Sequence, residues 1–391
     1  MVQIAWLGKK TPFCGNVSYG LSTTEALRSR GHQTHFIHFD NPRNPESNAT
    51  SLLANDPDVS LPYLVKSQVY TIPSPRAQRE LRESLERLKP DIVHASLTLS
   101  PLDFRLPDLC QQLGVPLVAT FHPPFDAGLR NITAGTQQLT YQLYAPALAR
   151  YDRVIVFSQL QADVLVRLGV PEQRLVVIPN GVDVNRWSPA VAGCPSPMLQ
   201  QVHRRVGSKR VFLYMGRLAT EKNVEALLQA WRMVDPQDSR LLIVGDGPLR
   251  SGLMNQYDEA SILWWGYEPD QATRIALMQC AEVFILPSLV EGLALALLEA
   301  MACGTACVAT DAGADGEVLN GGAGIVMSTQ GVTSQLRTLL PVLLQQPVLT
   351  AELARKARER ALERYTIDRN IDAIERLYSA LLQQPTVQQV A

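Results

Sequence analysis

The sequence predicts an α/β protein built from two tandem units, each with a parallel sheet covered by helices. Short apolar runs bounded by turn residues alternate with helical patterns along most of the chain. The 391 residues are also too many for one ordinary core. Between residues 187 and 208, three prolines and two glycines interrupt the alternation, as is typical of a linker. We therefore expect domains at 1–185 and 210–365, a linker at 186–209 and a helical segment at 366–391.

In the first half, six short apolar runs predict buried parallel strands. They lie at residues 4–7, 35–39, 92–94, 117–121, 154–157 and 175–178. The clearest helix between them spans 77–88, where Leu81, Leu85 and Leu88 share one face and arginines and glutamates share the other. This helix should end before Lys89-Pro90, because the residue preceding a proline avoids the helical conformation.

The second half repeats the alternation. Strands are predicted at 211–215, 240–244, 262–265, 283–286 and 306–309, and helices include 224–233 and 272–280. Residues 353–382 have helical periodicity with a break near Tyr365-Thr366, which predicts two helices.

Composition narrows the function. The chain has 36 Lys plus Arg against 37 Asp plus Glu, so it has no general basic field for a nucleic acid, and a dedicated DNA or RNA binder is disfavoured. Its six cysteines form no CxxC pair, which predicts reduced thiols in a cytoplasmic protein rather than a disulfide framework or a zinc site. No run approaches the roughly 20 apolar residues of a membrane span, so we expect a protein that is soluble or lies on a membrane surface.

The richest candidate site lies in residues 287–304, where Glu291 and Glu299 stand in a loop and the helix after it. Eight helical residues rise about 12 Å, so the two carboxylates cannot share a proton or a small metal ion, although they can hold two ends of an extended ligand. Residues 292–295 would form a helix N-terminus able to bind an anion. The alternative is that both glutamates are solvated, but an unpaired carboxylate within the apolar run around Glu299 would be costly to bury.

Two cations follow the strand predicted at 211–215. Arg217 and Lys222 stand where open α/β sheets bind ligands, and together they suit a diphosphate. An exposed loop with ordinary charges is the alternative.

The other candidate positions are individually weak. The turns at 245–248 and at Gly266-Tyr267 each follow a strand and could admit a nucleobase edge, but such turns commonly only bend the chain. In the first half, His122 ends a strand and the loop 13–20 follows strand one; both would face an interdomain cleft, although a lone histidine, including His94, is more often structural. That loop has no Gly-x-Gly-x-x-Gly run, so a dinucleotide fingerprint is not supported.

Taken together, these motifs closely resemble glycosyltransferase family 4. The resemblance rests on Glu-x7-Glu at 291–299, on Lys-Pro-Asp-Ile-Val-His at 89–94, on Ile-Pro-Asn-Gly-Val-Asp at 178–183, on Gly216-Arg217 with Lys222, and on Gly-Asp-Gly-Pro at 245–248. It implies a GT-B architecture, in which two Rossmann-like domains face a cleft, and a last segment that returns to the first domain. It further implies transfer from a nucleotide sugar with retention of configuration, without a metal or another cofactor.

The resemblance also implies residue roles. Arg217 and Lys222 would bind the diphosphate, Glu299 the ribose, Glu291 with the following amides the donor hexose, and His122 the hexose across the cleft. The implied catalytic set is Glu291, Arg217, Lys222 and His122. The implied donor-binding set is Gly15, Gly216, Arg217, Lys222, Gly266, Tyr267, Glu291, Gly292, Leu293, Ala294, Leu295 and Glu299.

Three positions depart from the family pattern and bear on the donor. The family often has Gly and Pro where this chain has Ala294 and Ala296, and often a paired glycine where it has Gly15-Asn16. Retention through two displacements needs a carboxylate nucleophile near the anomeric carbon. The pattern instead offers Glu291 mainly as a hydroxyl ligand, which favours same-face attack with the departing diphosphate as base.

The opening residues 4–19 resemble those of the galactolipid galactosyltransferases of oxygenic photosynthetic bacteria, the digalactosyldiacylglycerol synthases. This resemblance implies transfer from UDP-galactose to monogalactosyldiacylglycerol by a peripheral membrane protein on the cytoplasmic side. The first domain would then meet the membrane, through the basic face of helix 77–88 or through segment 121–144.

Three alternatives stay open. The first is transfer to a soluble sugar or a polysaccharide. The second is a nucleotide-sugar 2-epimerase, which the Glu-x7-Glu segment with Gly216-Arg217 fits less well. The third is a non-catalytic module that binds nucleotide sugars.

Overall fold

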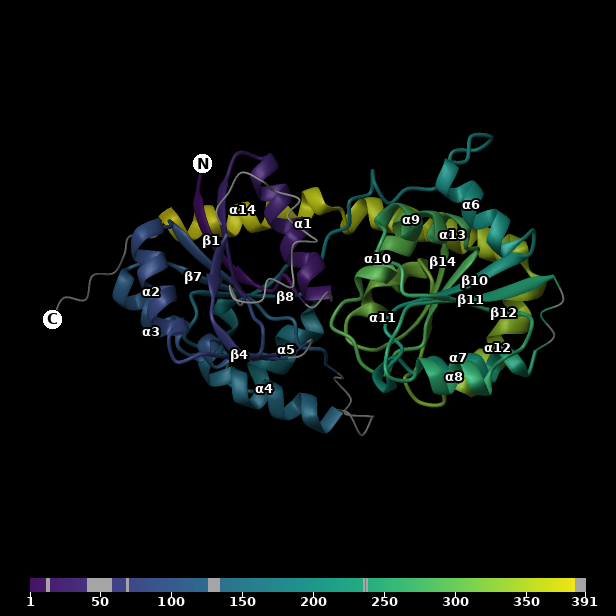
Figure 1. The fold of residues 1–391 in the computed structure, drawn as a ribbon, viewed down its shortest axis with the longest axis horizontal. Helices are drawn as coiled ribbons and strands as arrows, with labels where there is room; N and C mark the ends of the chain where they lie inside the picture. Colours follow the sequence, from purple (N-terminus) through teal and green to yellow (C-terminus); the bar gives the residue numbers. More distant parts are fainter. Residues whose placement is uncertain are drawn as a thin grey trace. The chain divides into compact units, whose positions relative to one another are not determined.

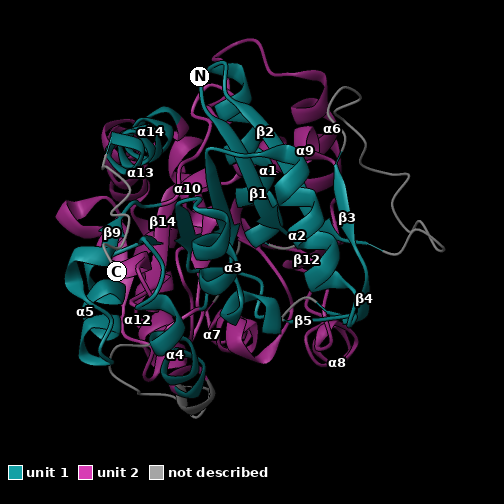
Figure 2. Ribbon diagram, turned by 90° about the vertical axis from the view of Figure 1, so that its left-hand side faces the viewer, with its two compact units in different colours: residues 1–123, 139–179, 368–391 teal, residues 124–138, 180–367 magenta. Residues whose placement is uncertain are grey.

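The computed structural model of the chain describes residues 1–11, 15–40, 58–67, 70–125, 134–234, 236 and 238–383. These residues fall into two compact units (Figure 2). Unit 1 comprises residues 1–123, 139–179 and 368–391, and unit 2 comprises residues 124–138 and 180–367. Each unit has its own parallel sheet, so the predicted α/β class is confirmed.

Unit 1 contains a seven-stranded parallel sheet in the order β3-β2-β1-β6-β7-β8-β9. The strands are β1 (Gln3–Gly8), β2 (Gln33–Phe39), β3 (Val59–Leu61), β6 (Ile92–Ser96), β7 (Leu117–Thr120), β8 (Arg153–Val156) and β9 (Leu175–Val177). An antiparallel ribbon, β4 (Tyr63–Lys66) with β5 (Thr71–Pro73), stands apart from this sheet. The strand order reverses next to β1, and open α/β sheets bind ligands beyond the carboxyl ends of strands at such a point.

The helices of unit 1 bury one apolar face each. They are α1 (Gly15–Ser29), α2 (Ala77–Leu88), α3 (Leu106–Leu113), α4 (Ala134–Leu148), α5 (Gln159–Arg167) and α14 (Ile367–Gln383), with short 3₁₀ turns at Pro101–Phe104 (η1) and Glu172–Arg174 (η2). Helix α2 has the predicted bounds because Leu81 and Leu85 are buried on one stripe. The first residues of α4 cluster with unit 2.

Unit 2 contains a six-stranded parallel sheet in the order β12-β11-β10-β13-β14-β15. The strands are β10 (Arg210–Met215), β11 (Ser239–Val244), β12 (Ile262–Gly266), β13 (Val283–Leu286), β14 (Ala306–Thr310) and β15 (Ile325–Met327). The strand order reverses between β10 and β13, so the loops that follow these two strands begin side by side.

Two layers of helices cover this second sheet. Figure 1 shows α7 (Val224–Arg232), α8 (Arg250–Gln256) and α12 (Val332–Gln345) on one side, and α6 (Pro197–Val206), α9 (Gln271–Cys280), α10 (Leu295–Ala302) and α13 (Pro347–Arg364) on the other. Short helical segments at Thr220–Lys222 (η3), Asp315–Val318 (α11) and Asn320–Gly322 (η4) lie in the loops.

The segment expected to be a linker contains a helix. Residues 186–209 include α6, which packs against α9 and buries Leu199, Val202 and Val206. The helix begins with Ser196, whose hydroxyl accepts a hydrogen bond from the N–H of Leu199, followed by Pro197. Pro197 therefore marks a helix start, because proline at the first helical position costs no hydrogen bond.

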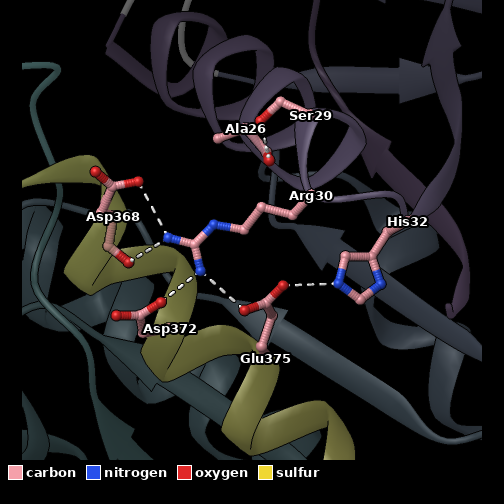
Figure 3. Close-up of polar contacts among 7 residues, drawn as sticks. All are labelled: Ala26, Ser29, Arg30, His32, Asp368, Asp372 and Glu375. Carbon is pink, nitrogen blue, oxygen red and sulfur yellow. Dashed lines mark hydrogen bonds and ion pairs between the residues drawn. The ribbon is translucent and has the colours of Figure 1, made fainter.

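Helix α14 joins unit 1 through charged contacts with the end of α1 (Figure 3). The guanidinium of Arg30 donates to the carboxylates of Asp368, Asp372 and Glu375. His32 Nε2 lies 2.8 Å from the second carboxylate oxygen of Glu375. Among the described residues, no helix is both long and apolar enough to cross a membrane.

Candidate functional site

In unit 2, the predicted site residues gather on loops at the carboxyl ends of the central strands. Arg217 and Lys222 follow β10, and Glu291 follows β13. The Nζ of Lys222 donates to Oε1 of Glu291 at 2.5 Å, and the hydroxyl of Ser288 donates to the same oxygen at 2.8 Å. The structure therefore joins directly two residues that the sequence suggested only for separate parts of a ligand.

The ion pair is largely buried. The Lys222 side chain is 23% exposed and that of Glu291 is 10% exposed. Burial by itself lowers the pKa of Lys222, but the adjacent Glu291 carboxylate outweighs it and raises this pKa, so the ammonium stays charged. The site thus holds one fixed cation beside one carboxylate.

Backbone contacts hold the two loops together around this pair. The N–H of Leu289 donates to the carbonyl of Glu221 at 2.8 Å, and the side-chain amide of Asn223 donates to the carbonyl of Pro287 at 3.2 Å. Asn223 begins α7 with φ of 51°, a left-handed conformation that asparagine tolerates better than most residues. Arg217, nearer to solvent, lies 3.6 Å from Glu221.

Glycines let the loop after β11 approach the loop after β10. A Cβ on Gly245, where φ is 138°, would lie 1.9 Å from the carbonyl oxygen of Gly216. One on Gly247 would lie 2.3 Å from the carbonyl oxygen of Leu218. Only glycine allows this contact, which fixes the backbone next to Arg217.

The segment 291–295 is anchored at four backbone positions. The carbonyls of Glu291, Gly292 and Leu293 accept hydrogen bonds from the Phe125 N–H, the Ala314 N–H and the Asn180 side chain, at 2.9, 2.8 and 3.1 Å respectively. The fourth anchor is the Ala294 N–H, which donates to Oδ1 of Asp315 at 2.9 Å. The amide of Ala294, suggested for the donor hexose, is therefore already engaged.

Asp315 and Ser288 were missed by the sequence reasoning. Asp315 is fully buried, and its pKa is raised well above the ordinary range by burial and by the nearby Glu291 charge. A usable signal existed, because Asp315 follows β14 at the same sheet edge as the other candidates.

Glu299 lies on α10, half-buried and separate from the ion pair. Burial raises the pKa of this carboxyl to about 7, and the charge of Arg274 opposes the rise. Gly266 ends β12, and its carbonyl accepts from the Gly245 N–H at 2.8 Å, which brings that turn beside the β11 loop. The neighbouring Tyr267 is 57% exposed.

In unit 1, His122 belongs to a hydrogen-bonded group beyond β6 and β7. The Asn16 amide donates to the Leu97 carbonyl at 3.0 Å, so its Oδ1 accepts from the Ser96 hydroxyl at 2.7 Å. Ser96 has then used its only proton, and His122 Nε2, 2.8 Å away, must donate to Ser96. Burial, with a smaller effect of Lys9, lowers the pKa of His122 to about 3, so the ring is neutral and Nδ1 is its acceptor atom.

Two other positions in unit 1 were predicted. Gly15 is the exposed first residue of α1, and a Cβ at this position would meet no other described atom within 4 Å. His94 is fully buried, and its nitrogens contact Thr120 Oγ1 at 2.7 Å and Tyr378 Oη at 2.5 Å. The structural interpretation of His94 is thereby confirmed.

The parts of the chain that the structure describes contain no group of three or more His, Cys, Asp or Glu side chains placed to hold a metal ion. Among the predicted residues in the loops after β10 and β13, the charged side chains are those of Arg217, Lys222 and Glu291.

Comparison with known proteins assigns both halves of the chain. Residues 15–186 match the family model for Glycosyltransferase Family 4, and residues 209–342 match the model for Glycosyl transferases group 1. An Escherichia coli UDP-Gal:alpha-D-GlcNAc-diphosphoundecaprenol alpha-1,3-galactosyltransferase is 26% identical over 76% of this chain and 77% of its own length. A Mycobacterium tuberculosis glycogen synthase is 30% identical over 70% of this chain and 64% of its own length.

Among solved structures, Anabaena HepE in complex with UDP-glucose superposes with a TM-score of 0.78 and 18% identity, over 97% of this chain and 100% of that one. This likeness, with the two parallel sheets, shows the GT-B fold. Because glycosyltransferase family models match both halves of the chain, the chain is a glycosyltransferase of this fold.

Proposed function

We propose that this enzyme transfers a hexose from a UDP-sugar, with retention of configuration, and that its preferred donor is UDP-galactose. The observation that carries the proposal is the buried Lys222–Glu291 pair beside Arg217, at the sheet edge where α/β proteins bind ligands. The names of the similar proteins support the donor class. One relative is named for UDP-Gal, and HepE was solved with UDP-glucose.

In the proposed reaction, Arg217 and Lys222 stabilise the leaving diphosphate without a metal ion. Glu291 uses one of the three N–H donors of the Lys222 ammonium, so a phosphate oxygen can take another. Two fixed cations next to the breaking bond favour the transition state, in which charge builds on the diphosphate.

Retention is proposed to follow same-face attack. Oε1 of Glu291 accepts from both Lys222 and Ser288, and such bonds reduce the nucleophilicity of a carboxylate. A covalent intermediate on Glu291 is therefore disfavoured, and the departing diphosphate takes the proton of the acceptor hydroxyl. Glu291 holds hexose hydroxyls, and Glu299 holds the ribose.

The proposed acceptor is a glycolipid, monogalactosyldiacylglycerol, used at the cytoplasmic face of a membrane by a peripheral enzyme. A relative named for a diphosphoundecaprenol substrate supports a lipid-linked acceptor. The basic face of α2 is less suited to an anionic membrane, because Arg79 and Arg82 on this helix pair with Glu83 and Glu86.

Helix α4 offers the better membrane contact of the two suggested surfaces. Its Leu139 and Leu143, one turn apart, are 66% and 61% exposed. We expect Leu139→Glu/Leu143→Glu to weaken sedimentation with galactolipid vesicles. Leu362→Glu, a change of a 43% exposed leucine on α13 of unit 2, is the matched control. Equal sedimentation of the two variants and the wild type would remove α4 from the proposal.

Transfer to a soluble sugar is the second candidate, favoured by the likeness to a glycogen synthase. The deciding experiment incubates purified protein with UDP-galactose or UDP-glucose and either monogalactosyldiacylglycerol vesicles or soluble sugars. Mass spectrometry and anomeric NMR then identify the products. An α-linked digalactolipid supports the lipid acceptor, and product on soluble sugars alone overturns it.

No transfer to any acceptor, with UDP still bound, would favour a non-catalytic binding module. Glu291→Ala sharpens this test, because the proposal predicts lost turnover with retained UDP binding. Nearly normal turnover of this variant would remove Glu291 from the reaction.

A further inference from the structure

Asp315 is a buried carboxyl group next to the ion pair, and the proposed reaction does not use it. It is 0% exposed and begins α11. Its Oδ1 accepts from the Ala294 N–H at 2.9 Å, while its buried Oδ2 has no hydrogen-bond partner among the described residues. Glu291 and Lys222 are the charged groups whose fields reach it.

The local charges explain which carboxyl carries a proton. Two carboxyl groups, of Glu291 and Asp315, share one buried ammonium, and Lys222 donates its hydrogen bond to Glu291. Burial and the Glu291 charge raise the pKa of Asp315 far more than the Ala294 N–H and Lys222 lower it. Asp315 is therefore the protonated acid, with Oδ1 accepting from Ala294 and the hydrogen on Oδ2, which receives no hydrogen bond from the described residues.

The same bond holds the residue at which α10 begins. Ala294 is the N-cap of α10, and an alanine side chain cannot cap a helix. Asp315 does not replace that cap, because it accepts from the N–H of Ala294 itself, but it ties the start of α10 to the loop after β14. The neighbouring Ala314 N–H holds the Gly292 carbonyl, and Gly313 packs so closely that a Cβ there would lie 2.2 Å from the Glu291 carbonyl oxygen. Residues 313–315 thus pack against segment 291–295 and hold it by two hydrogen bonds.

We infer that Asp315 is a positioning residue for the transfer reaction: as an uncharged acid it holds Ala294, and so fixes the direction of the Glu291 carboxylate and of the first amides of α10. The inference rests on the proposed function of the Glu291 segment. An uncharged group has a second advantage there, because a carboxylate would repel the donor diphosphate next to Lys222.

Two substitutions separate the hydrogen bond from the charge. Asp315→Asn keeps an acceptor oxygen and stays neutral, whereas Asp315→Leu keeps the volume and removes the acceptor. Asp311→Asn is the matched control, since Asp311 lies in the same loop and its Oδ1 accepts from the Thr329 N–H instead. The readouts are kcat, KM for the donor, the Kd of UDP and the urea midpoint of unfolding between pH 5 and pH 8.

We expect Asp315→Asn and Asp311→Asn to stay within about threefold of the wild-type kcat. Asp315→Leu should lower kcat by about tenfold or more, because a small displacement of a substrate-holding group is costly, while the Kd of UDP changes less than about threefold. Wild-type kcat in a folded Asp315→Leu protein would overturn the inference.

The pH readout does not depend on activity. An unfolded aspartate releases its proton near pH 3.9, well below the folded Asp315, so the native state binds more protons and wild-type stability falls as pH rises. Relative to the wild type, Asp315→Asn should therefore gain in midpoint from pH 5 to pH 8. The other charged groups around Asp315 are common to both proteins, so they cancel in the comparison. They are Lys222 and Glu291 on the facing loops, Asp311 and Glu317 on the same segment, and Arg360 of α13, which donates to the carbonyls of Glu317 and Val318.

If the difference in urea midpoint between Asp315→Asn and the wild type does not change with pH, Asp315 is not an uncharged acid in the folded protein. This comparison also decides the case if Asp315→Leu fails to fold. If neither the wild type nor any variant transfers sugar, the proposed function fails, but the pH comparison still reports whether Asp315 carries a proton.

Discussion

The Lys222–Glu291 pair should be strongly coupled in stability, and a double-mutant cycle measures this. The cycle uses Lys222→Met, Glu291→Gln and the double variant. At a separation of 2.5 Å, the attraction between two unit charges is about 7 kcal/mol at an effective dielectric constant of 20. Desolvation offsets most of it, but removing one partner leaves the other charge buried, which typically costs about 3–5 kcal/mol.

The exposure of the pair places the expected loss at the lower end. Because the Lys222 side chain is 23% exposed, we expect Lys222→Met to lose about 3 kcal/mol of unfolding free energy. Glu291→Gln, which leaves the ammonium without its partner, should lose a similar amount. The double variant removes both charges together and should lose about 1 kcal/mol, so the coupling energy, which is the sum of the two single losses minus the double loss, is about 5 kcal/mol. None of the three variants should transfer sugar, because both residues belong to the proposed site.

Urea unfolding followed by tryptophan fluorescence suits the measurement, since four of the five tryptophans, all except Trp6, lie in unit 2. The control cycle is Glu363→Ala with Arg364→Ala, an exposed pair at the end of α13 in unit 2 at 3.7 Å. It should show no coupling that denaturation can resolve. Additive losses for Lys222 and Glu291 would refute a buried ion pair, and recovered activity in the double variant would remove both residues from the reaction.

Three further predictions follow from other features. Gly245→Ala places a Cβ 1.9 Å from the Gly216 carbonyl oxygen and should cost about 3 kcal/mol or more by urea unfolding, whereas Gly252→Ala, in open space on α8, should be neutral or slightly stabilising; similar effects of the two changes would contradict the close approach. Burial, with a smaller effect of the neighbouring His122, lowers the pKa of His94 to about 3, so the contribution of His94 to the free energy of unfolding falls as pH drops below its unfolded pKa near 6.5, by about 2 kcal/mol at pH 5; this loss should be absent in His94→Gln, and equal pH dependence of the two proteins would argue against a buried neutral histidine. With the pKa of Glu299 raised by burial to about 7, UDP affinity measured by calorimetry should weaken from pH 8 to pH 6 in the wild type but not in Glu299→Gln; the same slope in both would separate Glu299 from the ribose.

The sequence predicts most of the long elements because their patterns are local. Helix α2 is found with its full bounds from one leucine stripe, and β13 from one apolar run. Helix α6 is missed because Pro197 at its start, with Pro195 just before it, obscures a helical pattern of only ten residues. Strands β3 and β5 have three residues each, which is too short for an alternation to stand out.

The candidate site divides in the same way. Loops that follow strands can be placed at one sheet edge from the order of elements, so Arg217, Lys222 and Glu291 were found. Their direct contact could not be predicted, because 69 residues separate Lys222 from Glu291 and no local pattern sets how two loops meet. Asp315 was missed for a related reason: its burial and its bond to Ala294 arise only when the loop after β14 closes on the one after β13.

The composition of unit 1 constrains how the chain can be made and divided. Its last helix, α14, contributes the Tyr378 hydroxyl that contacts buried His94 and the carboxylates that hold Arg30, yet residues 368–383 follow the whole of unit 2 in the chain. During synthesis the ribosome must therefore complete unit 2 before unit 1 can acquire its final helix, the reverse of the usual N-terminal-first order. A gene cut once between residues 179 and 180 would yield neither unit intact, whereas a permuted gene that joins residues 368–383 ahead of Met1 would encode the helix beside the sheet it covers.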